Sequence, residues 1–210
     1  MSEEVSVNDT IVKKKTATRT RSLAFCGLTI ALMAVSAWIS IPLGPVPFTL
    51  QTFVMVFALV ALTPGQCLAA IGGYLVIGAI GVPVFSSMRG GIGVLLGPTG
   101  GFLWGYLIGA ALALALLCVL GRYGGGRSDE KGRAAGGSAK RDRAGLAVSF
   151  AAALLFIVVM YVCGWAQYMA VSGVGPGVAF AVAVAPFIVV DLVKTVVGVL
   201  TARAVKQAIR

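Results

Sequence analysis

The sequence contains no histidine and little charge, since only 11% of its 210 residues are Asp, Glu, Lys or Arg. The missing histidine excludes His-dependent catalytic triads and most zinc sites. The chain also lacks a Gly-Lys-Ser or Gly-Lys-Thr run, so it has no phosphate-binding P-loop and does not hydrolyse ATP by that route. A soluble domain carries about 25% charged residues. The small charged fraction, with 59% hydrophobic residues and a mean hydropathy of +0.97, therefore predicts an integral membrane protein.

Three long stretches without any charged side chain set the number of membrane spans. They lie between Arg21 and Arg89, between Arg89 and Arg122, and between Arg143 and Asp191. Since a spanning helix needs about 20 apolar residues, these stretches and the segment that follows them accommodate six spans. Proline and glycine turns divide the runs, and we expect helices over residues 23–41, 48–62, 66–81, 100–121, 145–169 and 180–202. The predicted fold class is an all-α integral membrane bundle of six transmembrane helices.

A cleavable signal peptide is the alternative interpretation of the N-terminus. Five cations precede an apolar stretch, and Ala34-Val35-Ser36-Ala37 resembles a cleavage site. The apolar run continues past this point, however, which favours a first helix that is retained in the mature protein.

The distribution of cations predicts the orientation of the bundle. Five Lys and Arg precede the first expected helix, seven lie in the polar segment 122–143, and three follow the last helix, which makes 15 of the 17. By the positive-inside rule, both termini, the segment 1–22 and the loop 122–143 are then cytoplasmic. Residues 23–206 form one membrane domain, and the loop 82–99 is an extracellular cap. The net charge of +10 is thus topogenic and fits anionic lipid headgroups, with no nucleic-acid partner.

Glycines at regular spacing predict close helix packing. Gly97, Gly101, Gly105 and Gly109 recur every four residues, which places a smooth face where another helix can approach. Gly27-x-x-x-Ala31 repeats the small-residue spacing once in the first helix. That pair faces either a neighbouring helix or a different subunit.

Only three charges remain once the topogenic segments are removed, namely Arg89, Asp191 and Lys194. Charges at membrane depth are costly and are functional-site candidates by default. Asp191 and Lys194 are three residues apart on one helix face, about 18 Å from its cytoplasmic end. Mutual neutralisation alone would not need Arg89, nor the polar and glycine residues expected at the same outer level: Thr49, Gln51, Ser86, Ser87, Gly90 and Gly91. We therefore expect a pocket open to the exterior, covered by the glycine-rich loop.

Around these residues the sequence closely resembles the BioY family, the biotin-binding S components of energy-coupling factor (ECF) transporters. The resemblance is carried by the segments 45–51 (PVPFTLQ), 78–85 (GAIGVPVF), 90–91 (GG), 96–102 (LGPTGGF) and 191–194 (DLVK). It implies a six-helix membrane bundle that holds biotin near its outer face, with Asp191 and Lys194 in contact with the ligand. The family position before the Gly-Gly pair is often an amide or a small residue. Here it is Arg89, which would pair with the biotin carboxylate or with Asp191.

The resemblance also implies roles and partners. Asp191 would accept hydrogen bonds from the ureido N–H groups of biotin, and Lys194 would donate to biotin and balance Asp191. Phe48, Phe85 and Tyr74 would line the apolar part of the site. The implied function is high-affinity biotin uptake across the bacterial plasma membrane, together with a T component and two ATPase subunits. No cofactor, metal or catalytic residue is expected.

Two other functions stay open at this point. One is an S component or secondary transporter for another small solute, which would share the helix count and the ion pair. The other is a membrane-embedded enzyme that uses Asp191 as general acid or base. The sequence offers no histidine, no paired acidic residues and no metal-ligand cluster to support the enzyme.

Overall fold

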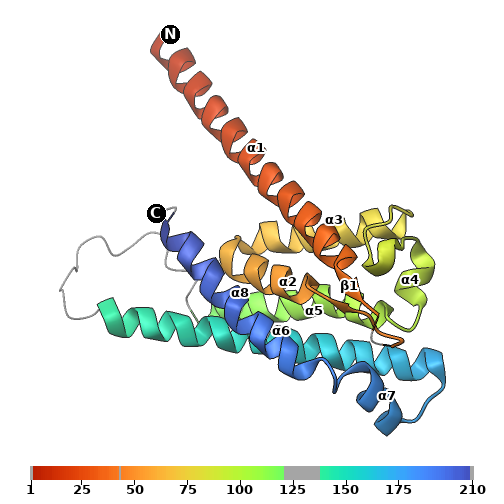
Figure 1. Ribbon diagram of the computed structural model, residues 1–210. Coiled ribbons are helices and arrows are strands. Elements are labelled where there is room, and N and C mark those ends of the chain that lie inside the picture. Colours follow the sequence, from red (N-terminus) through yellow and green to blue (C-terminus); the bar gives the residue numbers. More distant parts are fainter. Residues whose placement is uncertain (1, 43, 121–137, 209–210) are drawn as a thin grey trace.

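The computed structural model describes residues 2–42, 44–120 and 138–208, and in these segments it is almost entirely helical (Figure 1). A two-stranded hairpin joins the first two helices, pairing Ser40 with Thr49 and Ile41 with Phe48. In chain order the elements are α1 (Ser2–Trp38), β1 (Ser40–Ile41), β2 (Phe48–Thr49), α2 (Gln51–Ala61), α3 (Pro64–Ala79), the 3-10 turn η1 (Ser86–Met88), α4 (Ile92–Leu96), α5 (Gly100–Val119), α6 (Ser138–Ser172), α7 (Pro176–Ala183) and α8 (Ile188–Ala208).

The lengths and composition of these helices confirm a helical membrane protein. Within the described residues, Arg19–Trp38 of α1, the whole of α5, and Gly145–Ser172 of α6 are long and apolar enough to cross a membrane. The pair α7 and α8 forms a fourth candidate span that is bent by 48°. Helices α2 and α3 are apolar but shorter, with 11 and 16 residues.

Two expected boundaries are wrong. Helix α1 begins at Ser2 instead of residue 23, because the segment 1–22 contains no proline or glycine to stop it; its first half projects beyond the other helices (Figure 1). Helix α6 begins at Ser138, so the end of the expected loop 122–143 is helical, while residues 121–137 lie outside the described residues. The segment 82–99 contains the short elements η1 and α4, and its role as an extracellular cap stays a prediction.

The last expected helix is broken into α7 and α8. Pro186 has no N–H to donate and lies inside the break. The amides of Val184 and Ala185 both bond to the carbonyl of Phe180, so the regular i to i−4 pattern ends there. The chain then restarts as α8, with Asp191 in its first turn.

Helices α5 and α6 form the most extensive helix pair of the bundle, and glycines on α5 make the close approach possible. A Cβ atom on Gly105 would lie 2.7 Å from Cα of Met160, and one on Gly109 would lie 2.9 Å from the carbonyl oxygen of Phe156. A Cβ on Gly101 would collide with the carbonyl of Cys163. Gly97 precedes α5 in the bend after α4, so it does not belong to this face.

Two groups of buried apolar side chains hold the fold together. The larger core joins α2, α3, α5 and α6. Helix α8 packs closely against α2 at Gly198, where a Cβ atom would lie 3.2 Å from the side chain of Val56. The smaller one joins the hairpin to α6, α7 and the break before α8, and consists of Val46, Tyr168, Ala179, Ala183 and Phe187. The space between the two groups, at the hairpin end of the bundle, contains the pocket described below.

We predict that Gly105→Ala destabilises the protein by about 1–3 kcal/mol, because the added methyl group meets backbone atoms of α6 that cannot turn aside. The matched control is Gly72→Ala on α3, where a Cβ atom meets nothing within 4 Å. Alanine is the better helix former, so this control is neutral or slightly stabilising. Thermal unfolding of the detergent-solubilised variants measures both effects, and equal melting temperatures would contradict the assigned α5–α6 contact.

Candidate functional site

A pocket opens at the hairpin end of the bundle, where several elements converge. Its walls come from the hairpin strand β2, the start of α2, the turn at Phe85 and Ser86, and α4, α5, α6 and α8. Aromatic rings cover much of the wall, with Phe48, Phe85, Phe102 and Phe187 among them. The polar groups gather on one side of the pocket, around Asp191.

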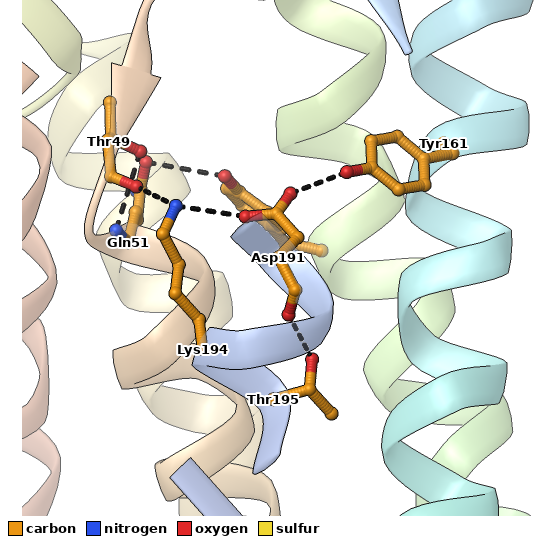
Figure 2. Close-up of polar contacts among 7 residues, drawn as sticks. Thr49, Gln51, Tyr161, Asp191, Lys194 and Thr195 are labelled. Atoms are coloured by element: carbon orange, nitrogen blue, oxygen red, sulfur yellow. Dashed lines mark hydrogen bonds and ion pairs between the residues drawn. The ribbon is translucent and has the colours of Figure 1, made fainter. Parts of the chain in front are cut away.

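Asp191 and Lys194 form a buried ion pair on the first turns of α8 (Figure 2). Lys194 Nζ lies 2.9 Å from Asp191 Oδ1, and only 5% of Asp191 and 7% of Lys194 are exposed. The ammonium also donates to the backbone carbonyl of Thr49 at 2.6 Å and lies 3.7 Å from the ring centroid of Phe48. Lys194 therefore fastens the hairpin to α8 as well as balancing the carboxylate.

The second oxygen of the carboxylate is bound from α6. Tyr161 donates its hydroxyl to Asp191 Oδ2 at 2.6 Å (Figure 2). Each oxygen thus accepts one donor from the protein and keeps a further lone pair for another. The position of Asp191 near the start of α8 also places its negative charge at the positive end of the helix dipole.

A second polar chain orients the side-chain amide of Gln51. Tyr74 donates its hydroxyl to the carbonyl of Val84 at 2.8 Å, so its oxygen is left to accept from Gln51 Nε2 at 2.7 Å. The carbonyl oxygen Oε1 of Gln51 then faces Tyr106, whose hydroxyl donates to it over a long 3.4 Å. Gln51 and Tyr106 line the pocket, whereas Tyr74 lies fully buried behind them.

This arrangement is suited to holding a small molecule that has both a polar and an apolar part. A carboxylate and an amide oxygen offer acceptors to ligand N–H groups, while the phenylalanines offer an apolar wall. Among the residues that the structure describes, no three His, Cys, Asp or Glu side chains are grouped to hold a metal ion.

Most of the residues that the sequence singled out meet at this pocket. Those that line it are Phe48, Thr49, Gln51, Phe85, Ser86, Asp191 and Lys194. Ser87, Arg89, Gly90 and Gly91 belong to the turn behind Ser86 and do not line it. Arg89 is exposed and its Nε donates to the carbonyl of Ser86 at 3.4 Å. Asp191 is bound by Lys194 and Tyr161, so the considered pairing of Arg89 with Asp191 does not occur in this structure.

The backbone of the turn explains its glycines. Ser87 and Met88 have φ angles of 58° and 55°, and the amide of Phe85 bonds to the carbonyl of Arg89 at 2.9 Å. At the next position, Gly90, a Cβ atom would collide with the carbonyl of Val82. Gly91 has a φ of 96°, which other residues rarely adopt. Both glycines therefore shape the turn that presents Ser86 to the pocket.

The sequence predictions named Tyr74 but not the two tyrosines that line the pocket, and they omitted several apolar residues of its wall. Tyr161 and Tyr106 contact the key polar groups, and Phe102, Met160 and Phe187 complete the wall. A signal was present, because a hydroxyl in the middle of an apolar span requires a partner. Only Tyr74 among the tyrosines was named from the sequence, so this signal was not used for Tyr106 and Tyr161.

Comparison with known proteins assigns the chain to a family. The model of the BioY family matches residues 9–210. A "Biotin transporter BioY" from Thermotoga maritima is 36% identical over 187 residues, covering 89% of this chain and 96% of the relative. A "Probable biotin transporter BioY" from Pyrococcus horikoshii is 33% identical over 184 residues, covering 88% and 95%.

A solved structure has the same fold. It is the crystal structure of the S-component for biotin from an ECF-type ABC transporter, which superposes with a TM-score of 0.75 over 91% of this chain and 93% of the other, at 22% identity. The family match over nearly the whole length and the two relatives above 30% identity agree with this fold, and the chain belongs to the BioY family.

Proposed function

We propose that this chain is the biotin-binding S component of an ECF transporter and mediates biotin uptake. The observation that carries the proposal is the buried Asp191 carboxylate, which faces a pocket with free acceptor capacity. The relatives named as biotin transporters support the choice of ligand. In this assignment the protein binds and carries its solute and performs no covalent chemistry.

The chemistry of biotin matches the two sides of the pocket. Its ureido N–H groups donate to Asp191, where each oxygen keeps a lone pair, and Gln51 Oε1 offers a further acceptor. Its fused thioether ring packs against Phe85, Phe102 and Phe187. Two of the three N–H donors of Lys194 bond to Asp191 and Thr49, and the centroid of the Phe48 ring lies 3.7 Å from its nitrogen, so at most one donor is left for the ligand.

We further propose six spans with both termini on the cytoplasmic side of a bacterial plasma membrane and the pocket on the outside. Helices α2 and α3 would be the two short spans, and the bent pair α7 and α8 would be the last. The distribution of charge supports this orientation. Arg203 and Lys206 lie at the end of α8 that is remote from Asp191, and Arg19 and Arg21 lie on the part of α1 remote from the hairpin.

We predict that the purified protein binds biotin and desthiobiotin, which share the ureido group, and does not bind thiamine or riboflavin. Asp191→Asn should weaken biotin binding by about 10- to 100-fold, because a charge-assisted acceptor becomes a neutral one. Ser149→Ala, a buried polar change on α6 away from the pocket, is the matched control and should bind normally. Calorimetry in detergent measures all of these. A folded protein that does not bind biotin, or that binds thiamine or riboflavin, would overturn the proposal.

We assign Arg89 to the biotin carboxylate, because its exposed guanidinium lies on the turn that supports Ser86 at the pocket. Arg89→Gln should then weaken the binding of biotin by about 2- to 5-fold, the size of an exposed charge pair, and the loss should shrink at high salt. Biotin methyl ester has no carboxylate, so its affinity should be the same for both proteins. An equal loss for acid and ester would exclude this role for Arg89.

We propose the exposed small residues of α1 as the docking surface for the T component, which two ATPases would energise. Gly27 and Ala31 are both exposed, and a Cβ atom on Gly27 meets nothing within 4 Å. Gly27→Leu should therefore reduce co-purification with the coupling proteins while leaving biotin affinity unchanged, because the added side chain blocks close helix approach. Leu23→Ala, an exposed change that removes bulk from the same helix, is the control. Undiminished recovery of the Gly27→Leu complex would count against this face.

A further inference from the structure

All three tryptophans of the chain lie near the pocket end of a long helix, and all three donate a hydrogen bond in the same manner. Trp38 ends α1, Trp104 lies in the second turn of α5, and Trp165 lies two turns before the end of α6. Each indole Nε1 donates to a backbone carbonyl of another segment. The acceptors are Pro83 at 2.8 Å, Leu95 at 3.2 Å and Pro176 at 3.0 Å, respectively.

Each acceptor belongs to a segment that closes part of the pocket. Pro83 precedes Phe85 and Ser86, which line it, and Leu95 follows Val94 on α4, which also lines it. Pro176 begins α7, whose Ala183 is part of the wall. Three separate covering segments, 82–91, α4 and α7, are thus each held by one indole from a spanning helix.

The three rings are all partly exposed, to different extents. Trp38 is 41% exposed and Trp104 is 40% exposed, and Trp165 is half-buried. An indole has a large apolar body and a single donor, so it suits a position where one side meets lipid and the other meets a polar backbone. Removing the donor while keeping the ring should therefore leave the packing of the bundle intact, including that of Trp165 against the small apolar cluster.

We propose that Trp38, Trp104 and Trp165 are positioning residues, whose indole N–H groups hold the three covering segments closed and thereby slow the escape of bound ligand. The assignment rests on the proposed function only where biotin is used to measure escape. The hairpin, which forms the fourth cover, is held differently, through Lys194 and Phe48. The three indoles donate to other segments, although Val46 and Phe48 share the small apolar cluster with Trp165. The hairpin therefore serves as an internal reference that loss of the indole N–H should affect less than the three covers.

The three indole hydrogen bonds should differ in how much each contributes to holding its segment closed. Segment 82–91 has a second side-chain bond, from Tyr74 to the carbonyl of Val84, and α4 has one from Gln167 to the carbonyl of Leu95. Helix α7 is otherwise held to its neighbours by the small apolar cluster around Ala179 and Ala183. Loss of the Trp165 bond should consequently have the largest effect.

The sharpest test replaces tryptophan by its isostere benzothienylalanine, which keeps the ring and lacks the N–H, in a tryptophan-auxotrophic host. Single Trp→Phe variants then separate the three positions. Each lost bond should raise the biotin dissociation rate about 2- to 10-fold, most for Trp165→Phe. Hydrogen exchange should accelerate in 82–96 and 173–183 clearly more than in the hairpin 40–49. Phe180→Leu is the control, since Phe180 is an equally exposed aromatic residue on α7 (47%) with no donor to lose.

Two results would overturn the inference. One is an unchanged dissociation rate with unchanged exchange in the isostere protein, and the other is faster exchange spread evenly over the hairpin and the covers. If the unmodified protein does not bind biotin at all, the proposed function fails, yet the hydrogen-exchange comparison still decides whether the indoles hold these segments.

Discussion

The buried contact between Asp191 and Lys194 is the constraint around which the pocket is organised. Leaving either charge alone at membrane depth would cost about 3–5 kcal/mol, the penalty of an unpaired buried charge. Neighbouring residues therefore bind both charged groups: Tyr161 from α6 donates to the carboxylate, the carbonyl of Thr49 accepts from the ammonium, and the ring of Phe48 lies against the ammonium. Because these partners come from α6 and from strand β2 of the hairpin, the pair fixes the hairpin and α6 relative to α8.

That arrangement depends in turn on helix packing that involves no charge. Gly101, Gly105 and Gly109 let α5 approach the backbone of α6 closely. The close approach lets Tyr106 on α5 and Tyr161 on α6 line one pocket, the first against Gln51 and the second against Asp191. A bulky residue on this face would separate the two hydroxyls. The glycine spacing is thus a requirement of the binding geometry as well as of the fold.

The sequence predicted the parts of this structure that depend on composition and spacing. Charge marked Asp191 and Lys194, and glycine periodicity marked the face of α5, because both signals are local. It could not predict that Arg89 lies outside the pocket, since this depends on the turn at Ser87 and Met88 with positive φ at residues that rarely adopt it. Nor could it predict the orientation of Gln51. The hydroxyl of Tyr74 donates to the carbonyl of Val84, 33 residues after Gln51, and can therefore only accept from the Gln51 amide.

The break between α7 and α8 was missed for a different reason, and it explains how a carboxylate is accommodated at this depth. Residues 184–187 are all apolar, so only Pro186 indicated that the helix is interrupted there. In an unbroken helix Asp191 would lie in mid-span, where the helix dipole gives a carboxylate no local support. The break creates a new helix start three residues before Asp191, whose unpaired N–H groups favour a nearby negative charge. A bend of 48° therefore converts an unfavourable position in a span into one where an anion is stabilised by the backbone itself, before any side chain contributes.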